Sequence, residues 1–538
     1  MMPLTAAVLM CSLGTTEPVI IEVTQDNTRI SESCRVRIPP TAVIADTDGD
    51  GVIHIASDRI VVEFEEGSVL RGAEVNDNWD TLTGFGIRLD GRKDVTLRNA
   101  AIAGFKVGLY ATRADGLTLE GLNIRDCYHQ RLRSTPEKEH NADWMFPHKN
   151  DQREWMTQHG GAVVVERSSG VTIRDVTVRT TQNGIILDRV SDAKVYDNDC
   201  SFLSGWGLAM WRSSDNVISR NAFDFCVRGH SEGVYNRGQD SAGILCFEQC
   251  SRNTFIENSA THGGDGFFGF AGREALGEVP PDPQDTFNRP FDPASAGCND
   301  NIIVGNDFSY APAHGLEMTF SAGNIIADNR FVENAICGIW GGYSRATFIE
   351  RNHFEGNGGM AYGLERGGIN IEHGSDNRII ANTFINNLCG VHIWWDDDGA
   401  LLQKPLVKAN DKGASDNFIL HNVFEVNADH PFKGPRHKDT PIIVLQLRDK
   451  GGGGNLKNNL YAGNTVRIRE PRAKELSVDP GCEPLTEGRV RLDFPGTKAE
   501  PLGDKRPVGA RAHLRGRDKI IMTEWGPWDH TGEPPARK

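Results

Sequence analysis

The sequence predicts an all-β solenoid, in which short strands stack coil upon coil. A phrase recurs through the middle of the chain: a glycine opens a short apolar stretch, a turn follows, and a second apolar stretch ends on asparagine. Two copies read GLAMWRSSDNVISRN (207–221) and GLEMTFSAGNIIADN (315–329). Asn306, Asn329 and Asn352 are 23 residues apart, a spacing typical of stacked repeat units. Each apolar stretch is too short for a helix and alternates as strands do.

The pattern resembles the right-handed parallel β-helix family, whose coil is shared by pectate-lyase-like and other carbohydrate-active proteins. In that family, successive coils lie in register and asparagines form a side-chain amide ladder inside one turn. The resemblance covers residues 38–466, implies about 11–12 coils, and indicates a fold rather than a reaction. Other copies of the phrase begin at Gly86, Gly108, Gly161, Gly184, Gly243, Gly338, Gly368 and Gly390. The implied ladder consists of Asn198, Asn221, Asn258, Asn306, Asn329, Asn352, Asn382, Asn422 and Asn464.

Two segments flank this solenoid. Residues 1–37 are expected to hold a signal-like stretch, MMPLTAAVLMCSLGTT, and a cap over the first coil. The stretch has an apolar core followed by small residues but lacks a basic n-region. Together with the fold it favours export, to the periplasm, the cell surface or the medium. Residues 467–538 form a C-terminal extension, in which an apolar run and the pair Trp525 and Trp528 favour a small additional β element.

The composition excludes some classes of function. No run of about 18 apolar residues is present, which argues against a transmembrane helix. The formal net charge of −15 argues against a nucleic-acid partner, because phosphate binding requires a basic face. The 11 cysteines are scattered without a CxxC spacing, so a structural zinc site is not expected. Buried thiols are the favoured interpretation, with disulfides left open.

One short segment resembles the opening of a calcium loop. Residues 46–53 read DTDGDGVI, which would supply Asp46, Asp48 and Asp50 as ligands. The twelfth position is Ser57 rather than the usual glutamate, so an Asp/Gly turn without metal is the competing interpretation. No cofactor is expected to be required, and calcium remains open.

Insertions indicate the working face. Where the ladder asparagines are more than 23 residues apart, the extra chain falls just before or just after the glycine-led strand. We therefore expect the insertions to form two walls along one strand face, with a binding groove between them. The insertions are residues 128–159, 228–241, 271–297, 355–367, 396–414 and 427–440.

The outward side chains of that strand change in character along the chain. Because side chains alternate along a strand, offsets two and four from the glycine should point outward. In the earlier coils they are mostly apolar, and we expect the 128–159 insertion to cover them. In the later coils they are acids, an amide, histidine and tryptophan, which suit a sugar site. The earlier pairs are Val163/Val165, Ile186/Asp188, Ala209/Trp211, Leu245/Phe247 and Phe268/Phe270, and the later ones are Glu317/Thr319, Trp340/Gly342, Asn370/Glu372 and His392/Trp394.

This face predicts glycoside hydrolysis, which requires a carboxylic acid and a second carboxylate. Glu317 and Glu372 are two coils apart, roughly 10 Å along the axis, which suits the roughly 6.5–9.5 Å of an inverting pair. Asp240 and Asp265 are alternative catalytic partners. The expected sugar contacts are Trp340, Trp394, Tyr343, Arg345, Asn370, His314 and Glu248.

Two other functions remain open. A polysaccharide lyase would use His392 as base, together with His314, Tyr343 and Arg345, but the face holds more acids than bases. A non-catalytic solenoid could bind glycan or metal, and the repeat also resembles the copper-delivery type of β-helix. The nine methionines are scattered rather than clustered with histidine, and no zinc motif has helical spacing. The expected partner is a glycan, and the oligomeric state stays undetermined.

Overall fold

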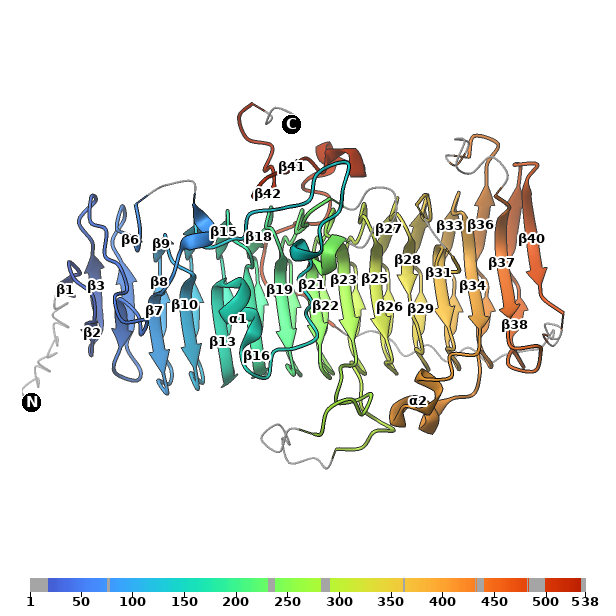
Figure 1. Cartoon of the computed structure of the whole chain (residues 1–538), viewed down its shortest axis with the longest axis horizontal. Coiled ribbons are helices and arrows are strands. Elements are labelled where there is room, and N and C mark those ends of the chain that lie inside the picture. Colours follow the sequence, from blue (N-terminus) through green and yellow to red (C-terminus); the bar gives the residue numbers. More distant parts are fainter. Residues whose placement is uncertain are drawn as a thin grey trace, which may run out of the picture.

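The computed structural model describes residues 18–74, 78–230, 238–281, 291–360, 363–430, 432, 440–480, 482 and 499–533. These residues form a right-handed parallel β-helix, which Figure 1 shows from the side with its long axis horizontal. Two long faces are 15-stranded parallel sheets, and the remaining face carries two five-stranded sheets. The predicted all-β class and solenoid architecture are therefore confirmed. The signal-like residues 1–16 lie outside the described residues.

The first long sheet consists, in spatial order, of β1 (Val19–Glu22), β3 (Cys34–Arg37), β5 (Val61–Phe64), β8 (Thr96–Arg98), β11 (Thr118–Glu120), β14 (Thr172–Arg174), β17 (Lys194–Tyr196), β20 (Val217–Ser219), β22 (Thr254–Ile256), β24 (Ile302–Val304), β26 (Ile325–Ala327), β29 (Phe348–Glu350), β32 (Arg378–Ile380), β35 (Phe418–Leu420) and β38 (Leu460–Ala462). The second long sheet consists of β2 (Thr28–Ile30), β4 (Ile53–Ile55), β7 (Phe85–Asp90), β10 (Val107–Thr112), β13 (Gly161–Ser169), β16 (Ile185–Ser191), β19 (Trp206–Trp211), β21 (Ala242–Phe247), β23 (Asp265–Phe270), β25 (His314–Thr319), β28 (Cys337–Trp340), β31 (Gly367–Glu372), β34 (Cys389–Trp395), β37 (Ile442–Asp449) and β40 (Ala473–Val478).

The five-stranded sheets are β6 (Val69–Arg71), β9 (Ala101–Ala103), β12 (Asn123–Arg125), β15 (Thr177–Arg179) and β18 (Asp199–Cys200), and then β27 (Arg330–Val332), β30 (His353–Glu355), β33 (Thr383–Ile385), β36 (Val423–Val426) and β39 (Thr465–Ile468). Outside the coils, the described residues form two α-helices, α1 (Glu154–His159) and α2 (Pro405–Asn410), and an antiparallel pair, β41 (Met522–Thr523) and β42 (Gly526–Pro527). Short 3₁₀ helices are η1 (Trp79–Thr81), η2 (Asn141–Asp143), η3 (Gly238–Asp240), η4 (Leu401–Gln403), η6 (Ala512–Leu514) and η7 (Arg517–Lys519).

The solenoid is longer than its sequence phrase indicates. Strand β1 already pairs in parallel with β3, and β40 pairs with β37, so the coils run from Val19 to Val478. Residues 19–37 therefore belong to the first coils rather than to a separate cap. The estimate of about 11–12 coils is too low, since the long sheets have 15 strands. The first coils carry neither the glycine-led phrase nor a ladder asparagine, which is why the sequence did not reveal them.

Asparagine amides connect successive coils at one corner. Asn329 is typical: its Oδ1 accepts hydrogen bonds from both the backbone N–H and Nδ2 of Asn306, each at 2.9 Å. Its Nδ2 donates to Asn352 Oδ1 (3.0 Å) and to the carbonyl of Ile303 (2.9 Å) in the coil before. The same donation to the next asparagine continues from Asn198 to Asn464. Each amide therefore satisfies buried backbone groups of its neighbours.

A second asparagine ladder was not recognised from the sequence. Its members precede those of the first ladder by five residues, as Asn216 precedes Asn221. Asn216 Nδ2 donates to Asn253 Oδ1 (3.0 Å), and Asn253 Nδ2 donates to Asn301 Oδ1 (3.1 Å). The repeated spacing of asparagines five residues apart was the available signal. Together the two ladders fix both ends of the short strands in the first long sheet.

The interior of the solenoid is apolar, with phenylalanine rings stacked along the axis. Neighbouring ring centroids are 4.6–5.7 Å apart, and the ring planes are nearly parallel. The stack consists of Phe308, Phe331, Phe354, Phe384 and Phe424. All ten cysteines of the described part are free, and nine of them are buried. The thiol interpretation is thus confirmed for those cysteines.

The insertions lie on the second long sheet and beside it. Met145, Trp155 and Met156 of the 128–159 insertion, which contains α1, pack on the outward apolar side chains of β16, β19 and β21. This confirms the expected cover. The 271–297 and 396–414 insertions pack on each other through Leu276, Leu406 and Val407, among other residues. Residues 231–237, 282–290, 361–362, 431 and 433–439 of the insertions lie outside the described residues.

The C-terminal segment returns to the middle of the solenoid. Figure 1 shows β41 and β42, in red, beside β15 and β18. Asp197 accepts hydrogen bonds from the backbone N–H groups of Asp504 (2.8 Å) and Lys505 (2.9 Å), and Arg511 pairs with Asp199 at 2.9 Å. The small antiparallel pair is the additional β element that the sequence favoured. Among the helices of the described residues, none is both long enough and apolar enough to cross a membrane.

We expect Asn329→Ala to lower the free energy of unfolding by about 3–5 kcal/mol, because it orphans buried donors and an acceptor in the coils on both sides. The matched control is Asn464→Ala at the end of the same ladder, where the side chain is partly exposed and water can replace the lost bonds. Urea denaturation at pH 7 measures both losses. Equal losses at the two positions would contradict the ladder as the source of the effect.

We also expect the free energy of unfolding to fall between pH 7 and pH 5. Four buried histidines stay neutral in the folded chain, since burial lowers their pKa to about 4 or 3, whereas in the unfolded chain they bind protons below about pH 6.5. Each of these histidines therefore lowers the free energy of unfolding by up to about 2 kcal/mol at pH 5. Denaturation at both pH values tests this, and equal stability at both values would contradict it. The four are His129, His159, His262 and His392.

Candidate functional site

The outward face of the second long sheet carries one continuous column of side chains. Strand register places Phe268, Glu317, Trp340, Asn370 and His392 at equivalent positions of β23, β25, β28, β31 and β34. The residues on either side in sequence, such as Leu316 and Ile369, point into the core. The outward assignment of the later coils is therefore confirmed.

The assignment failed in one earlier coil. Val163 and Val165 of β13 lie in the interior core, and the outward residues are Val164 and Glu166. The reason is that Gly161 pairs with Val107 rather than with Gly108. Counting from Gly161 therefore assigned each side chain of β13 to a position one residue away from its true one. Because side chains alternate, a shift of one residue exchanges the two faces.

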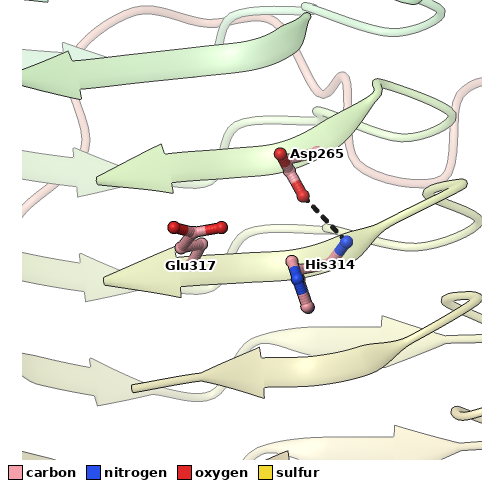
Figure 2. Close-up of side chains that lie close together, drawn as sticks. All are labelled: Asp265, His314 and Glu317. Atoms are coloured by element: carbon pink, nitrogen blue, oxygen red, sulfur yellow. Dashed lines mark hydrogen bonds between the residues drawn. The ribbon is translucent and has the colours of Figure 1, made fainter. Parts of the chain in front are cut away.

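Three predicted residues meet on β23 and β25. Figure 2 shows Asp265 on one strand and both His314 and Glu317 on the next. One ligand atom from each of the three lies within 4.8 Å of the other two. The carboxylate of Asp265 accepts a hydrogen bond from the backbone N–H of His314 at 2.8 Å, which fixes its orientation. All three side chains are buried, Glu317 being 7% exposed, and we call them the Asp265 cluster.

Two further groups border the Asp265 cluster. The ring of Trp340 stacks on His314 with centroids 5.3 Å apart and planes at 24°. The carboxylate of Glu365 lies 3.9 Å from His314 Nε2. Glu365 was not recognised from the sequence, because it belongs to the 355–367 insertion and follows no strand pattern; only its acidic side chain within an insertion pointed to it. The cluster is therefore flanked by an aromatic ring and by a third carboxylate.

Glu372 lies in a second group, two coils farther along. One ligand atom from each of Glu372, His373 and Asp396 lies within 4.8 Å of the others, and we call this group the Glu372 cluster. Burial, followed by repulsion from Asp396 and Asp398, raises the pKa of Glu372 to about 8. The structure thus joins Glu317 with Asp265 and places Glu372 with other partners, which differs from the predicted Glu317/Glu372 pairing.

Stacked rings support the Glu372 cluster. His373 lies between Tyr343, at 4.6 Å, and Trp395, at 5.1 Å. Its Nε2 is 3.3 Å from a carboxylate oxygen of Asp396, and burial lowers its pKa. The hydroxyl of Tyr343 donates to Asp398 at 3.2 Å. His373 was not recognised from the sequence because it follows the last residue of β31, where alternation no longer assigns a face.

His392 is enclosed rather than presented to solvent. It is 0% exposed, and its Nδ1 lies 2.9 Å from the carbonyl of Leu364, in the 355–367 insertion. Burial lowers its pKa to about 3. Asn370 donates to the same carbonyl at 2.6 Å and accepts from Trp394 Nε1 at 2.8 Å. These residues form one buried hydrogen-bonded network beneath the insertion.

Three predicted site residues lie elsewhere. Glu248 accepts backbone hydrogen bonds from Arg273 (2.9 Å) and Glu274 (2.8 Å), so it anchors the 271–297 insertion instead of facing a sugar. The guanidinium of Arg345 donates to the carbonyl of Ala294 at 2.8 Å, away from the column. Asp240 ends η3, and its carbonyl accepts from Trp206 Nε1 (2.8 Å) near the start of β19.

The calcium-like segment forms a tight turn. Asp46 accepts hydrogen bonds from the backbone N–H groups of Gly49 and Asp50 at 2.9 and 3.1 Å. Asp46 and Asp48 approach Asp26, whereas Asp50 lies 3.1 Å from His54. The three predicted ligands thus do not form a single group of their own, and calcium at this position stays a prediction.

Comparisons with known proteins agree with this architecture. Residues 286–404 match the family described as "Right handed beta helix region", and residues 86–266 match the family "Periplasmic copper-binding protein (NosD)". None of the curated proteins matches the sequence. With its parallel sheets in continuous register, the chain is a right-handed parallel β-helix protein.

Several solved structures are similar to parts of this chain at low identity. A DFA-IIIase from Arthrobacter chlorophenolicus A6, solved without its lid, is 13% identical; the match covers 61% of this chain and 83% of that one, with a TM-score of 0.40. A PL6 alginate lyase solved with a trisaccharide is 12% identical, over 86% and 88% of the two chains, with a TM-score of 0.40. A GH136 lacto-N-biosidase from Eubacterium ramulus is 10% identical, over 82% and 63%, with a TM-score of 0.35.

We expect Glu372→Gln to stabilise the chain more at pH 9 than at pH 5. The folded chain holds the proton of Glu372 up to about pH 8, whereas the unfolded chain releases it near pH 4.5, so stability is lost as the pH rises through this window. Glutamine stays neutral and removes that loss, by about 1–2 kcal/mol after solvent screening. Urea denaturation at both pH values measures the difference, and Glu425→Gln, on the distant β36, is the control. If Glu372→Gln changed the free energy of unfolding by the same amount at both pH values, the raised pKa of Glu372 would be contradicted.

Proposed function

We propose that the protein is a carbohydrate-active enzyme that hydrolyses glycosidic bonds at the Asp265 cluster. The observation that carries this proposal is the approach of the Asp265 and Glu317 carboxylates to within 4.8 Å on the outward face. Retaining glycosidases hold their two carboxyl groups about 5–5.5 Å apart. The spacing therefore favours a retaining reaction over the inverting one that the sequence suggested for Glu317 and Glu372.

The two carboxylates take different roles in this proposal. Asp265, whose orientation is fixed by the N–H of His314, attacks the anomeric carbon while Glu317 gives its proton to the leaving glycosidic oxygen. Glu317 then takes a proton from water, which attacks the glycosyl–Asp265 ester, releases the sugar and frees the carboxylate. Trp340, which aligns with Glu317 in the neighbouring coil, supplies a flat face for a sugar ring.

β-Elimination is less well supported. A lyase requires a base beside cations that neutralise a uronate. The predicted set does not converge: His392 is enclosed beneath Leu364, Tyr343 binds Asp398, and Arg345 points to Ala294. The acids around Glu372 would also repel a uronate carboxylate.

The cluster also has the geometry of a metal site. A histidine nitrogen and two carboxylate oxygens within 4.8 Å suit a divalent cation, and they come from two neighbouring strands, so no single-strand motif indicates them. Our proposal requires no metal, so dialysis against EDTA distinguishes metal-free hydrolysis from a metal-dependent reaction.

We further propose that the protein is exported, which the signal-like residues 1–16 support.

The test is turnover on a panel of neutral and uronic-acid polysaccharides, following reducing ends and the absorbance of unsaturated products. We expect reducing ends without new absorbance, and a loss of about 10²–10⁴ in kcat for both Asp265→Asn and Glu317→Gln. Glu317→Gln should retain the first-turnover burst of dinitrophenol from an activated aryl glycoside, because that leaving group needs no proton, whereas Asp265→Asn should not. Glu425→Gln is the matched control with full activity.

Three results would overturn the proposal. New absorbance would establish β-elimination. Activity lost on EDTA dialysis and restored by a divalent cation would establish a metal-dependent reaction. Glycan binding without turnover on any substrate of the panel would establish a binding solenoid.

A further inference from the structure

A large cavity lies between the C-terminal segment and the solenoid. Its volume is about 1100 Å³, slightly above the usual range of small-molecule sites. Its walls come from the 128–159 insertion, the turns around residues 179–181 and 202–204, and residues 520–529. No residue of the Asp265 or Glu372 cluster lines it, so it is a separate site. Figure 1 shows the C-terminal strands that form its outer wall.

Specific contacts hold this wall in place. The backbone carbonyl of Glu524 accepts a hydrogen bond from the backbone N–H of Leu132 at 2.8 Å. The side-chain carboxylate of Glu524 pairs with Arg131 at 2.5 Å. Gly526 has a φ of +135°, and a Cβ added there would lie 2.8 Å from Ser204 Cβ. The close approach therefore requires glycine at this position. The C-terminal segment that forms the cavity wall is therefore docked on the coils by specific contacts.

Aromatic rings form part of the lining. Trp79 stacks on His129 with centroids 4.7 Å apart, and Trp525 meets Trp79 edge-on at 5.1 Å. Trp528 and Phe202 line the same space. The three tryptophans are only partly buried, so ring surface remains available. Flat rings held at fixed angles are the surfaces on which sugar rings pack.

The polar lining suits an uncharged ligand. Hydroxyl groups are supplied by Thr135, Thr180 and Thr181, among others. Arg133 and Glu137 are exposed, carry opposite charges, and make no side-chain hydrogen bond or ion pair among the described residues. The charged lining consists of Arg133 and Arg179 against Glu137, Glu524 and Asp529, so the cavity offers no net positive potential to a polyanion.

We propose that this cavity binds a neutral oligosaccharide segment, as a glycan-binding site separate from the Asp265 cluster. The choice of a glycan rests on the proposed function, whereas the aromatic and hydroxyl lining stands by itself. Such a site would hold a long substrate on the enzyme while the cluster acts on another part of the chain. Its loss would therefore affect polymers and leave short substrates unaffected.

The test uses the full-length protein and hexasaccharides of glucose, mannose and xylose, with hexagalacturonate as the charged comparison. Titration calorimetry and tryptophan fluorescence measure binding. We expect at least one neutral hexasaccharide to bind, Trp528→Ala to weaken it about tenfold, and hexagalacturonate to bind more weakly. Trp144→Ala is the matched control, because Trp144 belongs to the same insertion but does not line the cavity. Trp79→Ala repeats the test if Trp528→Ala fails to fold, because Trp79 lines the same cavity and is partly exposed.

Two results would overturn the cavity as a glycan site: no neutral hexasaccharide binds the wild-type chain, or binding is unchanged in both cavity variants. The two proposals fail separately. Glu317→Gln should keep this binding, and Trp528→Ala should keep full activity on an aryl glycoside. Binding without any hydrolysis would contradict only the proposed reaction.

Discussion

Register between neighbouring coils is the constraint on which the rest of the structure depends. Each ladder asparagine accepts two hydrogen bonds from the asparagine of the coil before and donates to the one after, as Asn329 does between Asn306 and Asn352. Sliding one coil by a residue would leave several buried donors unsatisfied at once. It would also turn every core side chain outward. The amides and the apolar alternation therefore specify the same register.

That register creates the site. Because equivalent strand positions are about 4.8 Å apart in successive coils, residues distant in sequence become neighbours on adjacent strands, as Asp265 of β23 and His314 of β25 do across the 271–297 insertion. The fold thereby brings acids close together in a buried setting, which is costly for charge. Glu372 shows the cost directly, since burial and nearby acids raise its pKa to about 8. Groups perturbed in this way concentrate at functional sites.

The sequence was most informative where one residue type repeats. The glycine-led phrase and its asparagines gave the fold, and alternation from the glycine gave the outward residues of β25 to β34. It failed where the repeat is imperfect, as at Gly161, where the inward small residue is Ala162. It also failed for Glu365, because an insertion has no register of its own. The predicted pairing of Glu317 with Glu372 considered only residues in one strand column. Asp265, at the start of β23, lies outside that column and against His314.

The C-terminal segment adds what a solenoid cannot make alone. Stacked coils by themselves form ridges and flat sheets. A cavity requires a segment of the chain that leaves the repeat and returns to pack against it. Here the return is long: Ser219 Oγ donates to the carbonyl of Leu502 at 2.8 Å, across 283 residues of sequence. The closure entropy of so long a loop grows only logarithmically with its length, and the intervening coils are already ordered, so a few specific contacts suffice to dock the segment. The tryptophans that it brings beside Trp79 pack on neighbouring rings and still stay partly exposed, and this remaining ring surface is what the proposed glycan site would use.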